Sequence, residues 1–271
     1  MRPVALTIAG LDPSGGAGII ADVRTFEALG LTATAAITSV TFQNATGVFG
    51  ASHQTAEAVR RQVIPIIENF DVTCVKIGML PTPEIVREVA RLFRETHLPA
   101  PVVDPVMRSS SGYDLIDDEA IAVLMSDLLP LARVLTPNIP EAERITGFSI
   151  KDEEGMLRAA RTIREKSVRA VLIKGGHLRP PVDQRTQESR RKRDGEESDS
   201  EPEEAIDVLD NEGKVTIFRK EFVAGAELHG SGCILSAAIA AGLGKGMDLE
   251  DAVREAKDFV TQAIRNSLQR D

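Results

Sequence analysis

Residues His229–Ala241 read His-Gly-Ser-Gly-Cys-Ile-Leu-Ser-Ala-Ala-Ile-Ala-Ala and join a glycine-rich turn directly to an alanine-rich run that favours a helix. The first turn of such a helix presents unpaired N–H groups and the positive end of its dipole, which attract an anion such as phosphate. Gly230 and Gly232 flank Ser231 and let the backbone approach a ligand, and we expect a lowered pKa for the Cys233 thiol among these N–H groups. The stretch therefore predicts an anion cradle beside a thiolate. The alternative is a glycine-rich helix start with a small buried cysteine.

Composition and charge narrow the classes of function. The chain has 271 residues, of which 42% are hydrophobic, so it can bury a large core, and we expect a single domain over residues 1–271. The balance of 32 Lys and Arg against 41 Asp and Glu, with 4% aromatic residues, argues against nucleic-acid binding. No apolar run reaches the length of a membrane span and no signal-peptide cleavage site follows the start, so we expect a cytoplasmic protein. Cys74 and Cys233 lack the spacing of a metal site or a disulfide framework.

Strand-like and helix-like segments alternate along most of the chain. Short apolar or β-branched runs predict strands at residues 4–9, 32–42, 74–79, 102–105, 133–135 and 170–173. Apolar residues at helical spacing, several behind capping residues, predict helices at residues 19–29, 55–70, 82–96, 118–129, 138–147, 152–166 and 248–268, in addition to the helix after Gly232. The order predicts an α/β fold with three αβα layers around a mainly parallel sheet, and ligands at the carboxyl ends of its strands.

Residues 179–204 interrupt this pattern. They hold one aliphatic residue, a basic run at 190–193 and then an acidic tract, so we expect a disordered insertion that cannot bury enough apolar surface to fold. The basic run also fits a nuclear-localisation signal, although such clusters usually mark solvated loops. Residues 205–209 and 215–219 follow as a predicted β-hairpin.

Several polar residues lie where predicted strands end and helices begin. The loop Gly10–Gly18 is rich in glycine but has neither the ending of a P-loop nor the spacing of a dinucleotide fingerprint. Asp22 comes early in the next helix, where its carboxylate either stabilises the helix N-terminus or faces a ligand. Asp104 ends a strand, and Asn138 with Glu141 has the spacing of a capping box, which by itself explains that pair.

Taken together, nine stretches of the chain resemble the hydroxymethylpyrimidine/phosphomethylpyrimidine kinases of thiamine biosynthesis, in the ribokinase-like superfamily. They occur in the order of that family, at residues 6–18, 21–22, 43–44, 76–80, 104–107, 111–112, 136–141, 174–177 and 229–237. The resemblance implies a ribokinase-like kinase that uses ATP and Mg²⁺ to phosphorylate a primary alcohol on a pyrimidine, and then phosphorylates the monophosphate. We also expect a homo-oligomer, a dimer.

The resemblance also implies roles for individual residues. Gly230, Ser231 and Gly232 would hold the transferring phosphoryl group, and Cys233, where sugar-kinase relatives carry Asp, would accept the proton of the alcohol. Lys174 would act as a point charge on the ATP phosphates.

Further roles concern the nucleotide, the metal and the pyrimidine. Asn138 would lie with the nucleotide-binding residues or serve only as a cap, and Asp104 and Glu141 would order Mg²⁺. Gln43 offers an amide that can donate to a ring nitrogen and accept from an exocyclic amine. The other residues expected to line the pyrimidine pocket are Asp22, Gly10, Met79 and Val106.

Some positions depart from the family pattern, and two other functions compete. Leu228 replaces a common Thr, Phe42 replaces a small residue and affects the expected pocket shape, and a Gly/His-rich tail is missing. A vitamin B6 kinase is the nearest alternative, but enzymes biased toward B6 tend to have an apolar residue at the position of Gln43. A non-catalytic pyrimidine sensor is the other, and the retention of Cys233 and Lys174, together with Glu141, argues against it.

Overall fold

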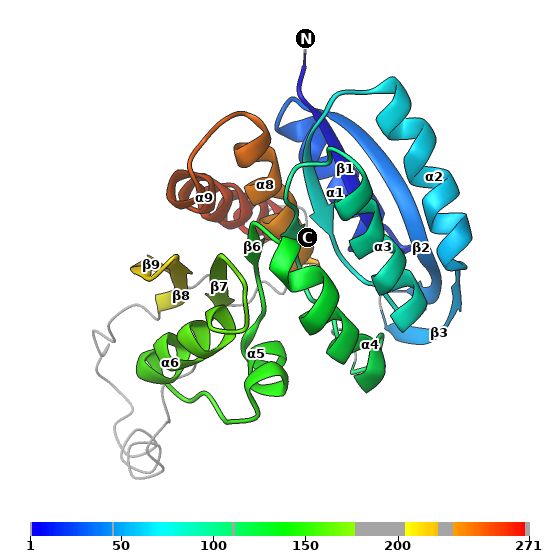
Figure 1. Ribbon diagram of the computed structural model, residues 1–271. Helices are drawn as coiled ribbons and strands as arrows, with labels where there is room; N and C mark the ends of the chain where they lie inside the picture. The colour runs from blue at the N-terminus through cyan, green and yellow to red at the C-terminus, as the bar shows by residue number, and fades with distance from the viewer. Residues whose placement is uncertain (1, 45, 110–111, 177–203, 222–229, 269–271) are drawn as a thin grey trace, which may run out of the picture.

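The computed structural model describes residues 2–44, 46–109, 112–176, 204–221 and 230–268 (Figure 1). In these residues the strands form one nine-stranded sheet in the order β3-β2-β1-β4-β5-β6-β7-β8-β9. The six strands from β2 to β7 in this order pair in parallel. Strand β3 pairs antiparallel with β2 at one edge, and β8 and β9 continue the sheet beyond β7 as antiparallel strands at the other edge. Their bounds are β1 (Val4–Leu11), β2 (Thr32–Asn44), β3 (Gly47–His53), β4 (Val72–Ile77), β5 (Val102–Val103), β6 (Val134–Leu135), β7 (Ala170–Lys174), β8 (Glu204–Asn211) and β9 (Lys214–Glu221).

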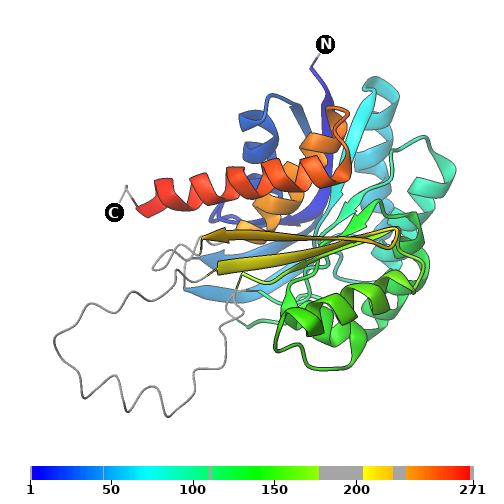
Figure 2. The same cartoon turned by 90° about the vertical axis from the view of Figure 1, so that its left-hand side faces the viewer.

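Helices cover both faces of this sheet (Figures 1 and 2). Three of them pack against one face: α1 (Gly18–Ala28), α8 (Ser231–Gly244) and α9 (Leu249–Leu268). The other face carries α2 (Ala56–Asn69), α3 (Pro83–Glu95), α4 (Asp118–Val123), α5 (Ile139–Thr146) and α6 (Glu153–Arg164). This arrangement confirms the predicted three-layer αβα fold with a mainly parallel sheet.

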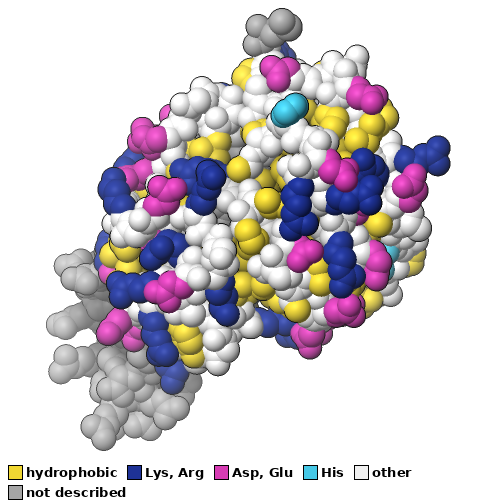
Figure 3. All heavy atoms as spheres, in the orientation of Figure 1, with side chains coloured by type: hydrophobic (Ala, Val, Ile, Leu, Met, Phe, Trp, Pro, Cys, Tyr) yellow, Lys and Arg dark blue, Asp and Glu magenta, His cyan; other side chains and the backbone are white. Residues whose placement is uncertain are grey.

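One face of the molecule mixes charges of both signs. On the face drawn in Figure 3, Lys and Arg side chains are interspersed with Asp and Glu side chains. Within the described ranges, no helix combines the length and the apolar character that a membrane crossing requires.

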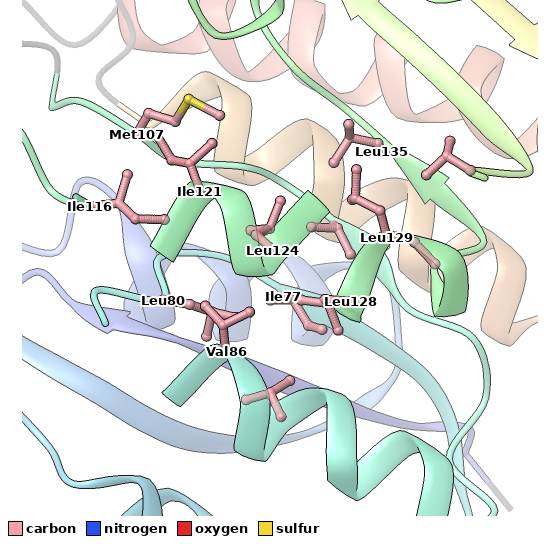
Figure 4. Close-up of a cluster of buried hydrophobic side chains, with 14 of the residues drawn as sticks. Ile77, Leu80, Val86, Met107, Ile116, Ile121, Leu124, Leu128, Leu129 and Leu135 are labelled. Atoms are coloured by element: carbon pink, nitrogen blue, oxygen red, sulfur yellow. The ribbon is translucent and has the colours of Figure 1, made fainter. Parts of the chain in front are cut away.

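Alternation along the strands divides the core into two clusters. Leu6 and Ile8 of β1 belong to the cluster under α2 to α6, whereas Ala5 belongs to the cluster under α1, α8 and α9, as expected for a sheet buried on both faces. Figure 4 shows part of the first cluster, in which side chains of the sheet, α3 and the α4 region meet. Lys174 is two residues after Leu172 and four after Ala170, both of which belong to the cluster under α8. Because side chains alternate along a strand, the Lys174 side chain lies on the same face of the sheet.

Local signals located the helix starts correctly. Thr55 and Thr82 accept hydrogen bonds from Ala58 and Ile85 as N-caps, as predicted. The helix predicted at 118–129 is correct only to Val123, after which a π-helical turn (Leu124–Leu128) and a 3-10 turn (Leu129–Leu131) follow. Pro130 accounts for this change, because proline cannot donate the helical hydrogen bond.

The strand predicted at residues 32–42 extends slightly further and then turns back as a strand that was not predicted. Strand β2 continues through Asn44, and β3 pairs with it antiparallel at the sheet edge. Phe42 is 54% exposed and its ring lies 3.0 Å from where a Cβ on Gly50 would stand. The residue lies over β3 and outside the cavity described below.

Two predictions about organisation are only partly covered by the described residues. The predicted insertion at 179–204 lies outside them, except for Glu204, where β8 begins. The predicted hairpin after it is confirmed as β8 and β9. A single domain over residues 1–271 stays a prediction.

Candidate active site

A cavity of about 170 Å³ lies at the carboxyl ends of the parallel strands. It gathers most of the residues selected from the sequence, namely Gly10, Gln43, Met79, Asp104, Val106, Asn138, Glu141, Lys174, Gly230, Gly232 and Cys233. Ser231 begins α8 beside them. His177, Leu228 and His229 of the family motifs lie outside the described residues.

Two glycine segments far apart in sequence form one wall of the cavity. Gly230 is the N-cap of α8 with φ +81°, and a Cβ there would lie 2.0 Å from the carbonyl oxygen of Gly16. Gly18 has φ +57°, and a Cβ there would lie 2.2 Å from the carbonyl oxygen of Gly10. The loop before α1 therefore packs directly against the start of α8, whose first N–H groups have no partners within the helix. These N–H groups lie where the anion cradle was predicted.

Lys174 and Asp104 place opposite charges beside this cradle. The Lys174 ammonium lies 2.7 Å from Oδ1 of Asp104, and a Cβ on Gly232 would lie 3.2 Å from Lys174 Nζ. Asp104 also accepts from Ser236 at 3.2 Å and from Thr136 at 3.3 Å. Burial opposes ionisation of Asp104, but Lys174 and a second lysine outweigh it and lower the pKa of the carboxyl. Burial likewise opposes the charge on Lys174, yet Asp104 and Glu141 raise the pKa of its ammonium.

The second lysine is Lys76, to which sequence reasoning gave no role of its own. It is fully buried, lines the cavity, and donates to both carboxylate oxygens of Asp22 at 2.9 and 2.8 Å. Burial opposes its charge, but Asp22, Cys233 and Asp104 together raise the pKa of Lys76. A lysine inside an apolar strand was the available signal, because a buried charge requires a partner.

Asp22 itself is placed differently from the prediction. It is fully buried, does not line the cavity, and accepts from Thr7 at 2.6 Å as well as from Lys76. Its carboxylate forms a buried ion pair that holds the Lys76 ammonium in place.

The predicted lowering of the Cys233 pKa was wrong. Burial raises the pKa of the thiol to about 11, and Asp104 and Asp22 add to this effect, while Lys76 and a hydrogen bond from the Gly18 backbone lower it. Desolvation therefore outweighs the helix N-terminus and the lysine. The thiol is protonated at neutral pH in the free protein.

Glu141 belongs to a capping box and also lines the cavity. The predicted capping box is present, with the Asn138 N–H donating to Glu141 at 2.8 Å and the Glu141 N–H donating to Asn138 at 2.9 Å. Glu141 is only 6% exposed. Burial raises the pKa of its carboxyl to about 7, since Lys174 lowers the value less than burial and Asp104 raise it. Glu141 thus gains and loses its proton near neutral pH.

Asp104 and Glu141, the two carboxylates expected to order Mg²⁺, both line the cavity. In the described part of the chain, no cluster of three or more His, Cys, Asp or Glu side chains forms a metal cage. Mg²⁺ is usually bound by one or two carboxylates together with waters and substrate phosphates, so the pair beside Lys174 suits this ion.

Gln43 and Asp12 link the opposite wall of the cavity to the glycine loop. Gln43 follows a β-bulge in β2, and its side chain donates to Asp12. Asp12 also accepts from the Ser14 backbone at 2.8 Å and from the Ala17 backbone at 2.9 Å. Burial opposes ionisation of Asp12, but these hydrogen bonds lower the pKa of its carboxyl. Asp12 was missed as a site residue, although an Asp before Pro and Ser is a turn signal.

Comparison with known proteins places this chemistry in a family. The family model for phosphomethylpyrimidine kinase matches residues 12–271. The chain belongs to this kinase family. The hydroxymethylpyrimidine/phosphomethylpyrimidine kinase of Haemophilus influenzae is 38% identical over 264 residues, covering 97% of this chain and 91% of that protein. The family assignment makes the protein a phosphotransferase and confirms the resemblance identified from the motifs.

Solved structures of kinases share the fold. The crystal structure of phosphomethylpyrimidine kinase from Clostridium difficile is 37% identical, with a TM-score of 0.78 over 97% of this chain and 100% of that chain. Pyridoxal kinase from Staphylococcus aureus, solved with AMP-PCP and pyridoxal, is 27% identical with a TM-score of 0.81 over 98% of this chain and 89% of that chain. The kinase family of this protein therefore has the ribokinase-like fold predicted for it.

Proposed function

We propose that this kinase transfers the γ-phosphoryl group of ATP to the hydroxymethyl group of 4-amino-5-hydroxymethyl-2-methylpyrimidine, and then phosphorylates the monophosphate to the diphosphate, in thiamine biosynthesis. The observation that carries the proposal is the cavity itself, which brings an amide from Gln43 together with Lys174, the start of α8 and Cys233. The named function of the Haemophilus influenzae relative supports the choice of substrate.

The phosphate side of the cavity supplies fixed positive charge. The N–H groups of Ser231 and Gly232 at the start of α8, together with Lys174, would bind the oxygens of the transferring group, where negative charge must be stabilised during transfer. Asp104 and Glu141 would hold Mg²⁺, which when bound neutralises phosphate charge. Asp104 also keeps the Lys174 side chain aimed at this region through their ion pair.

Cys233 would accept the proton of the substrate hydroxyl. As the hydroxyl oxygen bonds to the γ-phosphorus, the bond from that phosphorus to the bridging oxygen of ADP breaks and the proton moves to the sulfur. A thiol with a pKa of about 11 is protonated at rest, so only its minor thiolate form can take the proton. Lys76 and the Gly18 N–H favour that form.

The pyrimidine would lie between Gln43 and the apolar wall. The absence of a side chain at Gly10 lets its backbone lie close to Met79. A Cβ on Gly10 would lie 3.0 Å from the Met79 sulfur. The Gln43 amide already donates to Asp12, which leaves its carbonyl oxygen to accept from an exocyclic amine. Val106 closes the same cavity.

An ATP-consumption assay with three acceptors tests the proposal. We expect turnover with hydroxymethylpyrimidine and with its monophosphate at a kcat/KM above that for pyridoxal. A preference for pyridoxal would favour a vitamin B6 kinase, the class of the Staphylococcus aureus structure. Binding of the pyrimidine without turnover would favour a sensor.

We further propose a homodimer without nucleic-acid affinity. The acidic balance of the chain supports the second part, since nucleic-acid binding requires a basic surface. Light scattering should give twice the chain mass of 29.2 kDa, and a mass of one chain would contradict the dimer.

A further inference from the structure

Asp207 connects the turn after Lys174 to the last helix of the chain. Strands β7 and β8 pair so that Lys174 and Asp207 are register partners. Oδ1 of Asp207 accepts the N–H of Gly175 at 2.9 Å, and Oδ2 accepts from the Lys257 ammonium on α9. Asp207 and Lys257 are each only 6% exposed. Figure 2 shows α9 running alongside the β8–β9 hairpin, which is how the pair can span the two elements.

The turn that Asp207 holds has little freedom. A Cβ on Gly175 would lie 2.2 Å from the carbonyl oxygen of Ile206 and 2.7 Å from the end of Met156, so the turn packs against the β8 backbone. On the other side, the Lys174 N–H donates to the Pro137 carbonyl at 2.9 Å. The backbone on both sides of the Lys174 Cα is therefore anchored, and Asp207 provides the anchor on the side of β8.

A buried ion pair is a poor source of stability, because desolvation of both charges offsets their attraction. Here the carboxylate has a second task, since it accepts from the backbone N–H next to Lys174, whose side chain lines the cavity. Lys257 compensates the buried charge of the carboxylate through its other oxygen. We propose that Asp207 is a positioning residue whose oxygen on the Gly175 N–H fixes the turn after Lys174 and so keeps the Lys174 ammonium aligned with the transferring phosphate, while Lys257 serves as its counter-charge. This inference rests on the proposed role of Lys174.

Strand β8 contains a matched control. Asp210 accepts from the Gly213 N–H at 2.8 Å and from Arg164 at 3.0 Å, and it is 2% exposed. It therefore has the same chemistry as Asp207, at the hairpin turn and away from Lys174. Loss of this second pair removes a buried carboxylate and a turn contact without touching the cavity.

Two double variants isolate the contact to Gly175. D207N/K257M keeps an oxygen that accepts from Gly175 and removes both charges, whereas D207L/K257M removes the acceptor as well. We expect kcat within about threefold of wild type for the first and a decrease of roughly 10- to 100-fold for the second, because a small displacement of a positioned charge has effects of this size. The KM for the pyrimidine should stay within about twofold in both. The control D210L/R164M should lower Tm and leave kcat unchanged.

The outcomes separate three conclusions. Wild-type kcat in folded D207L/K257M overturns the positioning role, and so does a loss of kcat in D207N/K257M at an unchanged Tm. If D207L/K257M does not fold, the kcat of D207N/K257M at an unchanged Tm still tests the positioning role. Wild-type protein without pyrimidine kinase activity would instead overturn the proposed function. Full activity of K174M would remove the basis of the inference while leaving that function intact.

Discussion

Lys174 and Asp104 form a 2.7 Å ion pair between the ends of two parallel strands, with Asp104 only 2% exposed. The carboxylate thus holds a cation at the cavity without filling its capacity, since an ammonium has three donors. The proposed contact of Lys174 with phosphate oxygens would use its remaining N–H groups and leave the ion pair in place.

Replacement of Lys174 by Met should lower kcat by roughly 10- to 100-fold, because a hydrogen bond to a charged group contributes about 1.5–3 kcal/mol. The matched control is K214M, which removes an exposed lysine that pairs with Glu250 at 2.8 Å. Steady-state kinetics with saturating ATP should show wild-type kcat for K214M. Equal kcat values for the two variants would exclude Lys174 from catalysis.

In the absence of divalent cations, Glu141 should make the stability of the protein depend on pH. Its pKa is about 7 in the folded protein against an ordinary value of 4.5, so between these values the folded state holds a proton that the unfolded chain has released. The free energy of unfolding therefore falls as pH rises through that window, by at most about 1.4 kcal/mol per pH unit. Above the window, the effect of Glu141 on this free energy is constant. In EDTA, the Tm difference between E141Q and wild type should grow from about pH 4.5 to 7. A constant difference would contradict the raised pKa.

Cys233 is expected to act as the proton acceptor despite its raised pKa. C233A should lower turnover by roughly 10²- to 10⁴-fold and C233S should barely improve on it, whereas C233D should restore part of the rate. Because the thiol pKa is about 11, wild-type kcat should increase from about pH 7 to 9 and that of C233D should not. C74A is the control, since Cys74 is buried away from the cavity. Turnover of C233A above a tenth of wild type would rule out the base.

Gln43 should determine the choice between pyrimidine and pyridoxal. Replacement by Met removes the amide and leaves a polar edge of the pyrimidine unpaired, which costs about 1–3 kcal/mol. The ratio of kcat/KM for the pyrimidine to that for pyridoxal should fall by roughly tenfold or more. N44A, at the neighbouring exposed position, should keep the wild-type ratio. An unchanged ratio in Q43M would disprove the assignment.

Gly230 and Gly30 separate the effect of backbone conformation from that of close packing. Both have a positive φ, +81° and +82°, but a Cβ on Gly30 would meet nothing within 4 Å, whereas one on Gly230 would meet Gly16. G30A should therefore lose only about 1–2 kcal/mol of stability. G230A should lose more in urea denaturation and should also raise the KM for ATP. Similar losses with an unchanged KM would mean that the contact does not shape the site.

Features governed by local chemistry were predictable from the sequence. The capping box of Asn138 and Glu141, and the caps Thr55 and Thr82, depend on side chains three residues from the groups they bind. The alternation of strands and helices similarly predicted the layered fold. Strand β3 was missed because Gly50 and polar residues give it little strand propensity, and only pairing with β2 makes it a strand.

Features that depend on distant partners were not predictable. Lys76 meets Asp22 across 54 positions of sequence, so neither residue by itself revealed the buried pair. The Cys233 pKa follows from desolvation by the surrounding walls, and the helix start that suggested a thiolate is a smaller effect. Motif matching located the cavity residues, but their protonation states required the assembled structure.

The contact between Gly230 and Gly16 has a consequence for how the protein is made. The two sides of this cavity wall come from opposite ends of the chain, so a ribosome must have translated residue 230 before that wall can close. A nascent chain of any shorter length carries the first glycine loop without its counterpart. ATP, which stabilises only the states that bind it, should therefore protect the finished chain and offer no such protection during synthesis.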